Sequence, residues 1–182
     1  MTGEEFAAAA RLSAGDLVRA RFLLSDPGRE LRAAALGWPP AAKSQPWLSL
    51  LGSAKAAGED AEDAARRALE EDAEAGIKRT ARDVADAARR AGRRRRTEVL
   101  DLGLELVASW FRDLAAVAVG AEDVVFNRDR LDRLRSQAAG LDPSRPRRAV
   151  ELVQETRRSL DLNVSEELAL EALFFRLERL FG

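Results

Sequence analysis

The chain has 182 residues, 46% of them hydrophobic, which is enough to bury the core of one domain or slightly more. Its net charge of -1 favours neither nucleic acid nor an anionic membrane as a partner of the whole molecule. Cysteine, histidine and tyrosine are absent, which excludes disulfides, thiolate chemistry, histidine metal ligands and a Ser/His/Asp triad.

The segment types point to helices and to a protein outside the membrane. No apolar run approaches the roughly 20 residues of a membrane span, and acids stand near the N-terminus where a signal peptide has basic residues. We therefore expect a cytoplasmic protein. Ala, Leu, Glu and Arg dominate, and no segment alternates apolar and polar residues as a strand does. The predicted fold class is all-α, a helical bundle preceded by a shorter helical segment.

Two short helices are predicted at the N-terminus. Thr2 and Glu5 have the spacing of a capping box, which opens the first helix. Residues 13–15, Ser-Ala-Gly, end it. Asp16 then has the position of an N-cap for a second helix through about Leu24.

A third short helix and a linker follow. Asp26 and Pro27 fit the N-cap and the first position of a helix that ends near residue 37. Helix breakers gather in residues 37–46 and predict a boundary there; they are Gly37, Pro39, Pro40 and Pro46. Trp38 and Trp47 flank this linker as packing anchors.

A short helix over 46–57, ending at Gly58, and a long helix over 59–91 are predicted next. Small apolar residues recur every three or four positions along the long helix and form one thin stripe: Ala61, Ala65, Leu69, Ala73, Ile77, Ala81, Val84, Ala88 and Ala91. Residues 59–75 contain eight acids and two bases, and residues 76–96 contain nine bases and two acids. This order of charges suits the dipole of a single helix.

The strongest amphipathic pattern covers residues 97–119, ending at Gly120. Its apolar residues share nearly half the circumference: Val99, Leu100, Leu104, Leu106, Val107, Trp110, Phe111, Leu114 and Val117. Polar residues take the other side: Asp101, Glu105, Ser109, Arg112 and Asp113. Trp110 is therefore predicted to lie in the core.

Two further helices are predicted before the last one. Asn127 is the expected cap of a helix over about 128–139, which ends at Gly140. Pro143 or Ser144 opens the next helix. Its apolar stripe is Ala149, Leu152, Val153, Thr156 and Leu160.

The last helix is apolar on two sides. Ser165 is its expected N-cap, followed by Glu166 and Glu167. One broad face consists of Leu170, Leu173, Phe174, Leu177, Leu180 and Phe181, and the opposite face of Leu168, Ala172 and Phe175. A helix with two apolar faces lies centrally in a large bundle or is shared with another subunit. Leu168, Ala172 and Phe175 are therefore the candidate subunit interface.

The basic run Arg89–Arg96 is the second candidate site. Within it, Arg93, Arg94, Arg95 and Arg96 are the candidate DNA or phosphate contacts, because clustered arginines release counterions on binding DNA. A solvated helix end, paired with the acids of residues 59–75 or of a neighbour, remains the alternative. No aromatic side chains are interleaved for base stacking. Glu166, Glu167 and Glu171 favour a capping and surface role over metal binding.

Four segments carry a resemblance to a known family. The terminal SLDLNVSEELALEALFFRLERL (159–180), LELVASWFRDLAAVAVG (104–120) and FNRDRLDRLRSQA (126–138) resemble the collar domain of bacterial clamp-loader subunits. RLSAGDLVRARFLLSDPGRELR (11–32) is similar to the end of an AAA+ lid. Order and spacing match the delta-prime type of subunit of the DNA polymerase III clamp loader.

The resemblance implies a lid remnant over 1–36, a linker and short helix over 37–58, and a collar domain over 59–182. Phosphate-loop, Walker B and zinc-cysteine motifs are absent, and the position of the lid's sensor arginine is Val18, with Arg19 beside it. The resemblance thus implies a non-catalytic assembly domain that binds other clamp-loader subunits, with indirect contact to DNA, no membrane, no cofactor and no small-molecule substrate. The alternative is a free-standing helical adaptor or DNA-associated regulator that uses Arg89–Arg96.

Overall fold

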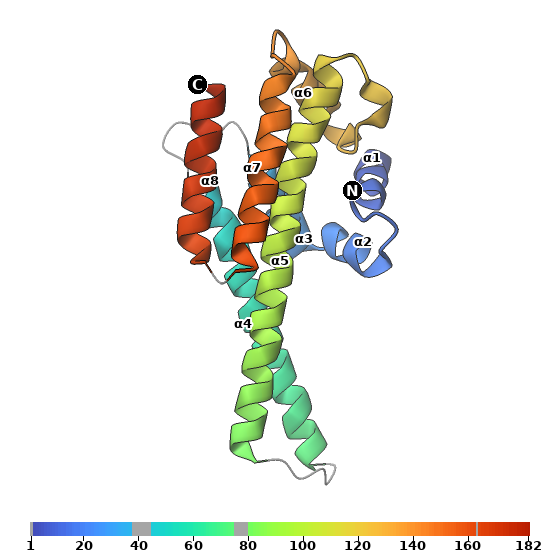
Figure 1. Cartoon of the computed structure of the whole chain (residues 1–182). Helices are drawn as coiled ribbons and strands as arrows, with labels where there is room; N and C mark the ends of the chain where they lie inside the picture. Colours follow the sequence, from blue (N-terminus) through green and yellow to red (C-terminus); the bar gives the residue numbers. More distant parts are fainter. Residues whose placement is uncertain (1, 38–44, 75–79, 163) are drawn as a thin grey trace.

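The computed structural model describes residues 2–37, 45–74, 80–162 and 164–182, and every regular element in these residues is helical. This confirms the all-α prediction. Figure 1 shows a bundle around one long helix, with a two-helix arm projecting from one end. The elements are α1 (Gly3–Leu12), α2 (Leu17–Leu24), α3 (Asp26–Ala35), α4 (Pro46–Glu74), α5 (Ala81–Ala118), the 3-10 turns η1 (Glu122–Val124) and η2 (Arg128–Arg130), α6 (Leu131–Ala138), α7 (Ser144–Leu160) and α8 (Glu166–Phe181).

Side-chain caps set the starts of α1 and α2 as predicted. Thr2 Oγ1 accepts a hydrogen bond from Glu5 N at 3.2 Å, and Glu5 Oε2 accepts one from Thr2 N at 2.7 Å, which completes the capping box. Asp16 Oδ1 accepts from the amides two and three residues later, at 2.8 and 3.0 Å. Each cap supplies an acceptor for amides that have no partner within the helix.

The predicted cap of α3 is wrong by one residue. Ser25, not Asp26, is the N-cap, and its hydroxyl accepts from Gly28 N at 3.3 Å. Asp26 and Pro27 occupy the first turn, where a negative charge and a missing N–H are both favourable. Residues 38–44 of the predicted linker, with Trp38, lie outside the described residues.

The helices α4 and α5 form a helical hairpin instead of the three helices predicted over this part of the chain. α4 runs from Pro46 to Glu74 without a break at Gly58, and α5 begins at Ala81 and contains the predicted helix 97–119 except for its last residue. The predicted helix end at Gly58 and the continuous helix 59–91 are therefore both wrong. The division predicted between residues 58 and 59 lies inside α4.

A close backbone approach explains the glycine that was misread as a helix end. A Cβ atom on Gly58 would lie 3.0 Å from the carbonyl oxygen of Gly92, and one on Gly92 would lie 2.9 Å from that of Gly58. The two helices cross at this point with no room for a side chain. Glycine serves both to end helices and to admit a neighbouring backbone, so the residue alone does not distinguish the two roles.

The start of α5 carries a local signal that the periodicity analysis overlooked. Thr80 Oγ1 accepts from Asp83 N at 3.1 Å and caps the helix. The spacing Thr-x-x-Asp is a recognised helix-start pattern. The predicted stripe of small apolar residues continues past Thr80 because each helix of the hairpin presents small residues to the other.

The arm consists of the second half of α4 and the first half of α5, which lie side by side in opposite directions (Figure 1). The acidic residues of 59–72 thus run beside the basic residues of 81–96. The sequence predicted a single helix with acids at its start and bases at its end. In the structure the acids and the bases lie on two antiparallel helices, whose opposite charges attract each other. Ala88 and Gly92 are buried at this contact.

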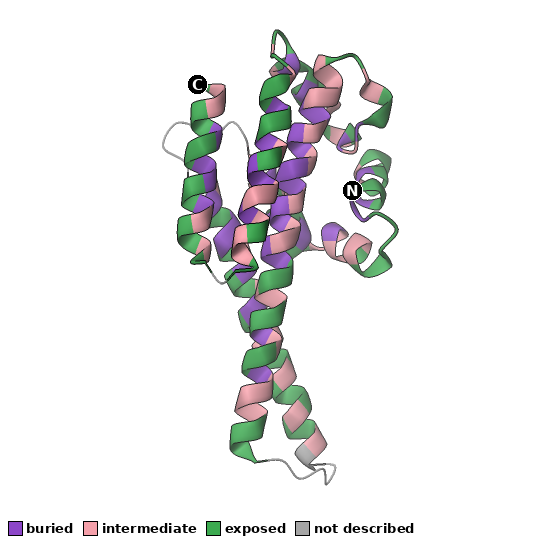
Figure 2. Cartoon of the chain, in the orientation of Figure 1, coloured by how far each residue is buried: buried purple, intermediate pink, exposed green. Residues whose placement is uncertain are grey.

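α5 is the centre of the core. The predicted apolar face is buried, including Trp110 and Phe111 at 0% exposure, with Val117 packed at its edge. Figure 2 shows burial concentrated on α5 and on the facing sides of α7 and α8, whereas the arm is mostly exposed. The core also takes in residues of α1, α2, α3 and α4, among them Leu31, Leu50 and Trp47.

The connection from α5 to α7 differs from the prediction in its first half. Asn127 is not a helix cap: it precedes η2 and makes no capping bond, and its side chain is buried. Gly140 ends α6 with a φ of 71°, as a left-handed terminal residue. The predicted stripe of α7 is buried, with Leu160 at its edge.

Candidate functional site

The final helix has one face in the core and one in solvent. Ser165 caps it as predicted, with its hydroxyl accepting from Leu168 N at 3.5 Å. The inner face is buried through Leu170, Leu173, Phe174 and Leu177. Phe181 extends this face by stacking on Phe111, with 5.3 Å between ring centroids.

The outer face of α8, defined here as Leu168, Ala172 and Phe175, is exposed. Leu168 is 63% and Phe175 59% exposed, and Ala172 lies in the exposed class between them. At 100° per residue these three positions fall within one narrow sector. The two faces are thus those expected from the sequence, and the structure shows that the face of Leu170, Leu173, Phe174 and Leu177 turns inward.

Charged side chains flank the outer face on both sides. Glu171 and Glu178 lie along one edge and Arg176 along the other, whereas Arg179 lies within the sector, one turn beyond Phe175; all four are exposed. Arg179 lies over the Phe175 ring at 5.9 Å from its centroid. An apolar sector between an acidic and a basic edge fixes both the position and the direction of a helix that would lie on it.

The six arginines of the run Arg89–Arg96 divide into two that contact other helices and four that are exposed. Arg96 Nε donates to Glu166 Oε2 at 2.8 Å and ties α5 to the first turn of α8. Arg95 lies over the Phe22 ring at 4.6 Å and pairs with Glu98. The run's Arg93 and Arg94, by contrast, are exposed on the arm. Of the four predicted phosphate contacts, two thus have partners within the chain and two are exposed on the arm.

Arg19, which the sequence resemblance places next to a sensor position, is held by the bundle. It forms a salt bridge with Glu105 of α5, and its side chain is 26% exposed. Its Nε is buried without a hydrogen-bond partner in the described part of the chain. Val18 beside it is 76% exposed.

The structure contains a buried polar cluster that sequence analysis missed. Asp113 was placed on the polar side of its helix, yet it is fully buried. Its carboxylate accepts from Phe126 N at 3.0 Å, from Asn127 N at 2.8 Å and from Asn127 Nδ2 at 2.8 Å. This carboxylate orders the turn between η1 and η2, because it supplies the acceptors that the turn's amides lack.

The same cluster attaches α3 to η2. Arg32 donates through Nη2 to Asn127 Oδ1 at 2.8 Å, and through Nη1 and Nη2 to Asp129 at 2.9 and 2.7 Å. The Asp129 side chain is 5% exposed and that of Arg32 is 11% exposed. A two-point contact between guanidinium and carboxylate fixes orientation as well as distance. Sequence gives no sign of it, since the partners are 97 residues apart.

A second arginine clamp joins α7 to α5. Arg157 donates to Asp101 through Nε at 2.6 Å and Nη2 at 2.8 Å, and to Glu105 through Nη2 at 2.9 Å. The hydrogen bonds to Asp101, reinforced by the charges of both carboxylates, raise the pKa of Arg157 above its ordinary value. Glu105 thus serves both Arg157 and Arg19.

Neither the sequence nor the fold matches a protein-family model, a curated protein or a solved structure. Within the residues that the structure describes, no three acidic side chains gather in a way that could hold a metal ion. Among the same residues, no helix has both the length and the apolar character needed to cross a bilayer.

Proposed function

We propose that this chain is a non-catalytic assembly domain, which binds a neighbouring subunit through the outer face of α8. The observation that carries the proposal is the exposure of Leu168 and Phe175 on a helix whose other face already completes the core. A single exposed leucine needs no explanation, but a second apolar sector with a large aromatic residue does. Aromatic side chains of this kind are frequent anchors of interfaces.

The occupant we propose is a helix of another subunit. It would place its own apolar residues on Leu168 and Phe175. The acidic edge, Glu171 and Glu178, then favours a basic flank on the partner, and Arg176 on the opposite edge favours an acidic one. This arrangement selects one direction of the partner helix and disfavours the reverse.

At a finer level we propose a clamp-loader subunit of the delta-prime type, acting in sliding-clamp loading during DNA replication. The support is the resemblance of residues 104–120, 126–138 and 159–180 to the collar, together with the resemblance of 11–32 to the end of an AAA+ lid. A collar that packs in a ring with those of other subunits provides a use for an exposed face on the last helix. Arg19, being paired with Glu105, is consistent with a subunit that does not sense nucleotide.

Native mass spectrometry of the chain, alone and mixed with candidate clamp-loader subunits, tests this proposal. A hetero-complex of defined stoichiometry is expected. If the chain stays free in every mixture at micromolar concentration, the clamp-loader assignment is rejected. If it instead forms a complex with a protein of another kind, the assembly role stands and the finer assignment falls.

A DNA-associated adaptor is the second candidate function, and the exposed arginines of the arm favour it. Arg89, Arg90, Arg93 and Arg94 are all exposed on the first half of α5. Fluorescence anisotropy with duplex DNA at several salt concentrations would test this function. Loss of a phosphate contact in Arg93→Gln or Arg94→Gln lowers the slope of log K against log salt by about one. A chain that shows no binding at low salt would eliminate this candidate.

A further inference from the structure

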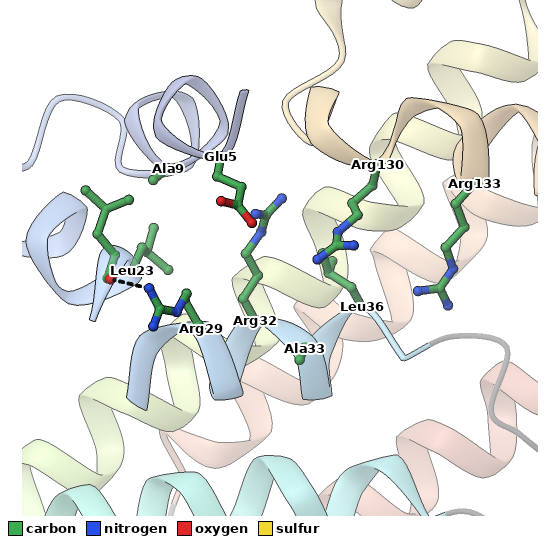
Figure 3. Close-up of a pocket in the computed structure, with 10 residues that line it drawn as sticks. Glu5, Ala9, Leu23, Arg29, Arg32, Ala33, Leu36, Arg130 and Arg133 are labelled. Carbon is green, nitrogen blue, oxygen red and sulfur yellow. Dashed lines mark hydrogen bonds between the residues drawn. The ribbon is translucent and has the colours of Figure 1, made fainter. Parts of the chain in front are cut away.

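A recess between the N-terminal helices and the η2–α6 segment is lined by four arginines. It has a volume of about 190 Å³, and its charged walls are Arg29 and Arg32 of α3, Arg130 of η2 and Arg133 of α6. Figure 3 shows Arg32 rising from α3 toward Glu5, while Arg130 and Arg133 reach toward it from the opposite wall. None of the residues that line the recess belongs to α8.

Arginines outnumber acidic residues in the described lining of the recess. Glu5 is the one acidic residue among the described residues that line it. Asp129 lies behind Arg32 and also approaches Arg130 Nε at 3.5 Å. Asp26 pairs with Arg29 at the rim, but its side chain is 82% exposed, so solvent weakens this pair. Among the lining residues that the structure describes, the four arginines thus outnumber the one carboxylate.

Contacts within the protein hold two of the arginine side chains in position without a ligand. The Arg32 side chain is fixed because its two terminal nitrogens donate hydrogen bonds to Asp129 and Asn127. Arg133 lies over the Trp110 ring, 5.1 Å from its centroid. Burial, and then the nearby positive charge of Arg130, lowers the pKa of Arg133 below its ordinary value. The crowding of like charges on preorganised side chains is a feature of anion sites.

We propose that this recess binds a phosphate group, either free inorganic phosphate or a small phosphomonoester. The arginines stand on two walls, so an anion between them must offer oxygens in more than one plane. A carboxylate has two coplanar oxygens, which one guanidinium occupies side by side. A phosphate group offers three or four tetrahedral oxygens and up to two negative charges. It can accept from α3 and from η2–α6 at once.

Apolar residues close the rest of the recess and limit the size of the ligand. Leu23, Leu24, Ala33 and Leu36 contribute to the lining. They leave room for the charged head and a short substituent. Binding would connect α3 to α6 through the ligand and add to the attachment that Arg32 and Asp129 already make. It goes beyond the docking role of α8, and the two proposals stand independently.

Isothermal titration of the full chain with inorganic phosphate, and in parallel with glycerol 3-phosphate, tests the proposal at constant ionic strength. Saturable binding with one site is expected, and the tighter of the two ligands identifies the source. Arg130→Gln and Arg133→Gln should each weaken binding by about tenfold or more, because each removes a hydrogen bond to a charged group. Arg32→Gln is a less useful variant, since Arg32 also holds the fold.

Arg158→Gln is the matched control, because it removes one exposed positive charge outside the recess. Its affinity for phosphate should equal that of the unchanged chain. Absence of saturable binding to either ligand overturns the proposal. An equal loss in Arg158→Gln and Arg133→Gln overturns it as well, because the effect would then be one of net charge.

Discussion

Asp113 shows how far a single residue can depart from its helical-wheel position. It stands next to Arg112 at the edge of the polar side of α5, and the chain turns back over it after α5 ends. The turn brings the amides of Phe126 and Asn127 to its carboxylate. Arg112 pairs with it from outside, at 3.2 Å, while lying over the Phe126 ring at 3.7 Å.

Asp113→Ala should destabilise the fold by about 3–5 kcal/mol, because it leaves buried donors without their acceptor and Arg112 without its partner. Urea unfolding measures the change. Asp123→Ala is the control: its side chain is exposed, so the expected effect is within about 0.5 kcal/mol. Equal stability of the two variants would show that the buried cluster adds nothing to the fold.

The pKa of Glu122 reports on its surface contact with Arg135. Arg135 donates to both of its oxygens, at 2.9 and 2.7 Å. This hydrogen bonding, aided by the charge of Arg135, lowers the pKa of Glu122 below its ordinary value. Because the pKa of Glu122 is lower in the folded chain than in the unfolded chain, the pair stabilises the fold at pH values above the pKa of the unfolded chain. The contribution disappears as the pH falls through the folded pKa.

An NMR titration of the Glu122 carboxyl carbon should therefore give a pKa below the ordinary value, and Arg135→Gln should return it toward that value. Asp142 is an internal control, because its pKa is lowered by the amide and the hydroxyl of Ser144 instead. It should be the same in both proteins. A Glu122 pKa that does not respond to Arg135→Gln would remove the contact as its cause.

At the scale of single elements, local signals were readable and long-range ones were not. Thr2, Asp16 and Ser165 act as caps within a few residues of themselves, so the sequence predicts them. The role of Gly58 depends on Gly92, a residue in another helix. Asn127 is a residue type that often caps helices, but its side-chain oxygen, which would accept from a helix amide, accepts from Arg32 of a distant helix instead. Periodicity also cannot tell a continuous helix from a hairpin whose two branches share one stripe.

The crossing at Gly92 predicts opposite effects for two glycine-to-alanine changes in the hairpin. Gly52→Ala meets no atom within 4 Å and should stabilise the helix by up to about 1 kcal/mol, because alanine is the better helix former. Gly92→Ala gains the same propensity, but its Cβ would lie 2.9 Å from a main-chain oxygen that cannot move aside.

Gly92→Ala should therefore destabilise the chain by about 1–3 kcal/mol through overpacking. It should also speed hydrogen exchange in the arm. Chemical denaturation of both variants gives the comparison. Were Gly92→Ala to stabilise the chain as Gly52→Ala does, the close approach of α4 and α5 would be disproved.

For the whole molecule, the fold class and the two faces of α8 were predictable, and the arrangement of the arm was not. The apolar pattern of α8 has a period that fixes which residues share a face. Which face is buried depends on the position of α8 against α7 and α4, which periodicity does not contain. The basic run shows the same limit, because Arg96 is drawn to Glu166, 70 residues away.

The central claim is that α8 holds the fold with one face and a partner with the other. Leu173→Ala, on the inner face, should cost about 2–5 kcal/mol of stability through lost burial and a cavity. Phe175→Ala, on a residue that is 59% exposed, should leave the melting temperature nearly unchanged. The two variants thus separate the stability of the fold from assembly.

The most direct test is the affinity of Phe175→Ala for the partner subunit that native mass spectrometry identifies. We predict a loss of about tenfold or more, since removal of an anchor residue at an interface commonly costs 2 kcal/mol or above. The melting temperature of the chain should stay within a few degrees of the original. An unchanged affinity would contradict the claim, because the outer face of α8 would then lie outside the interface.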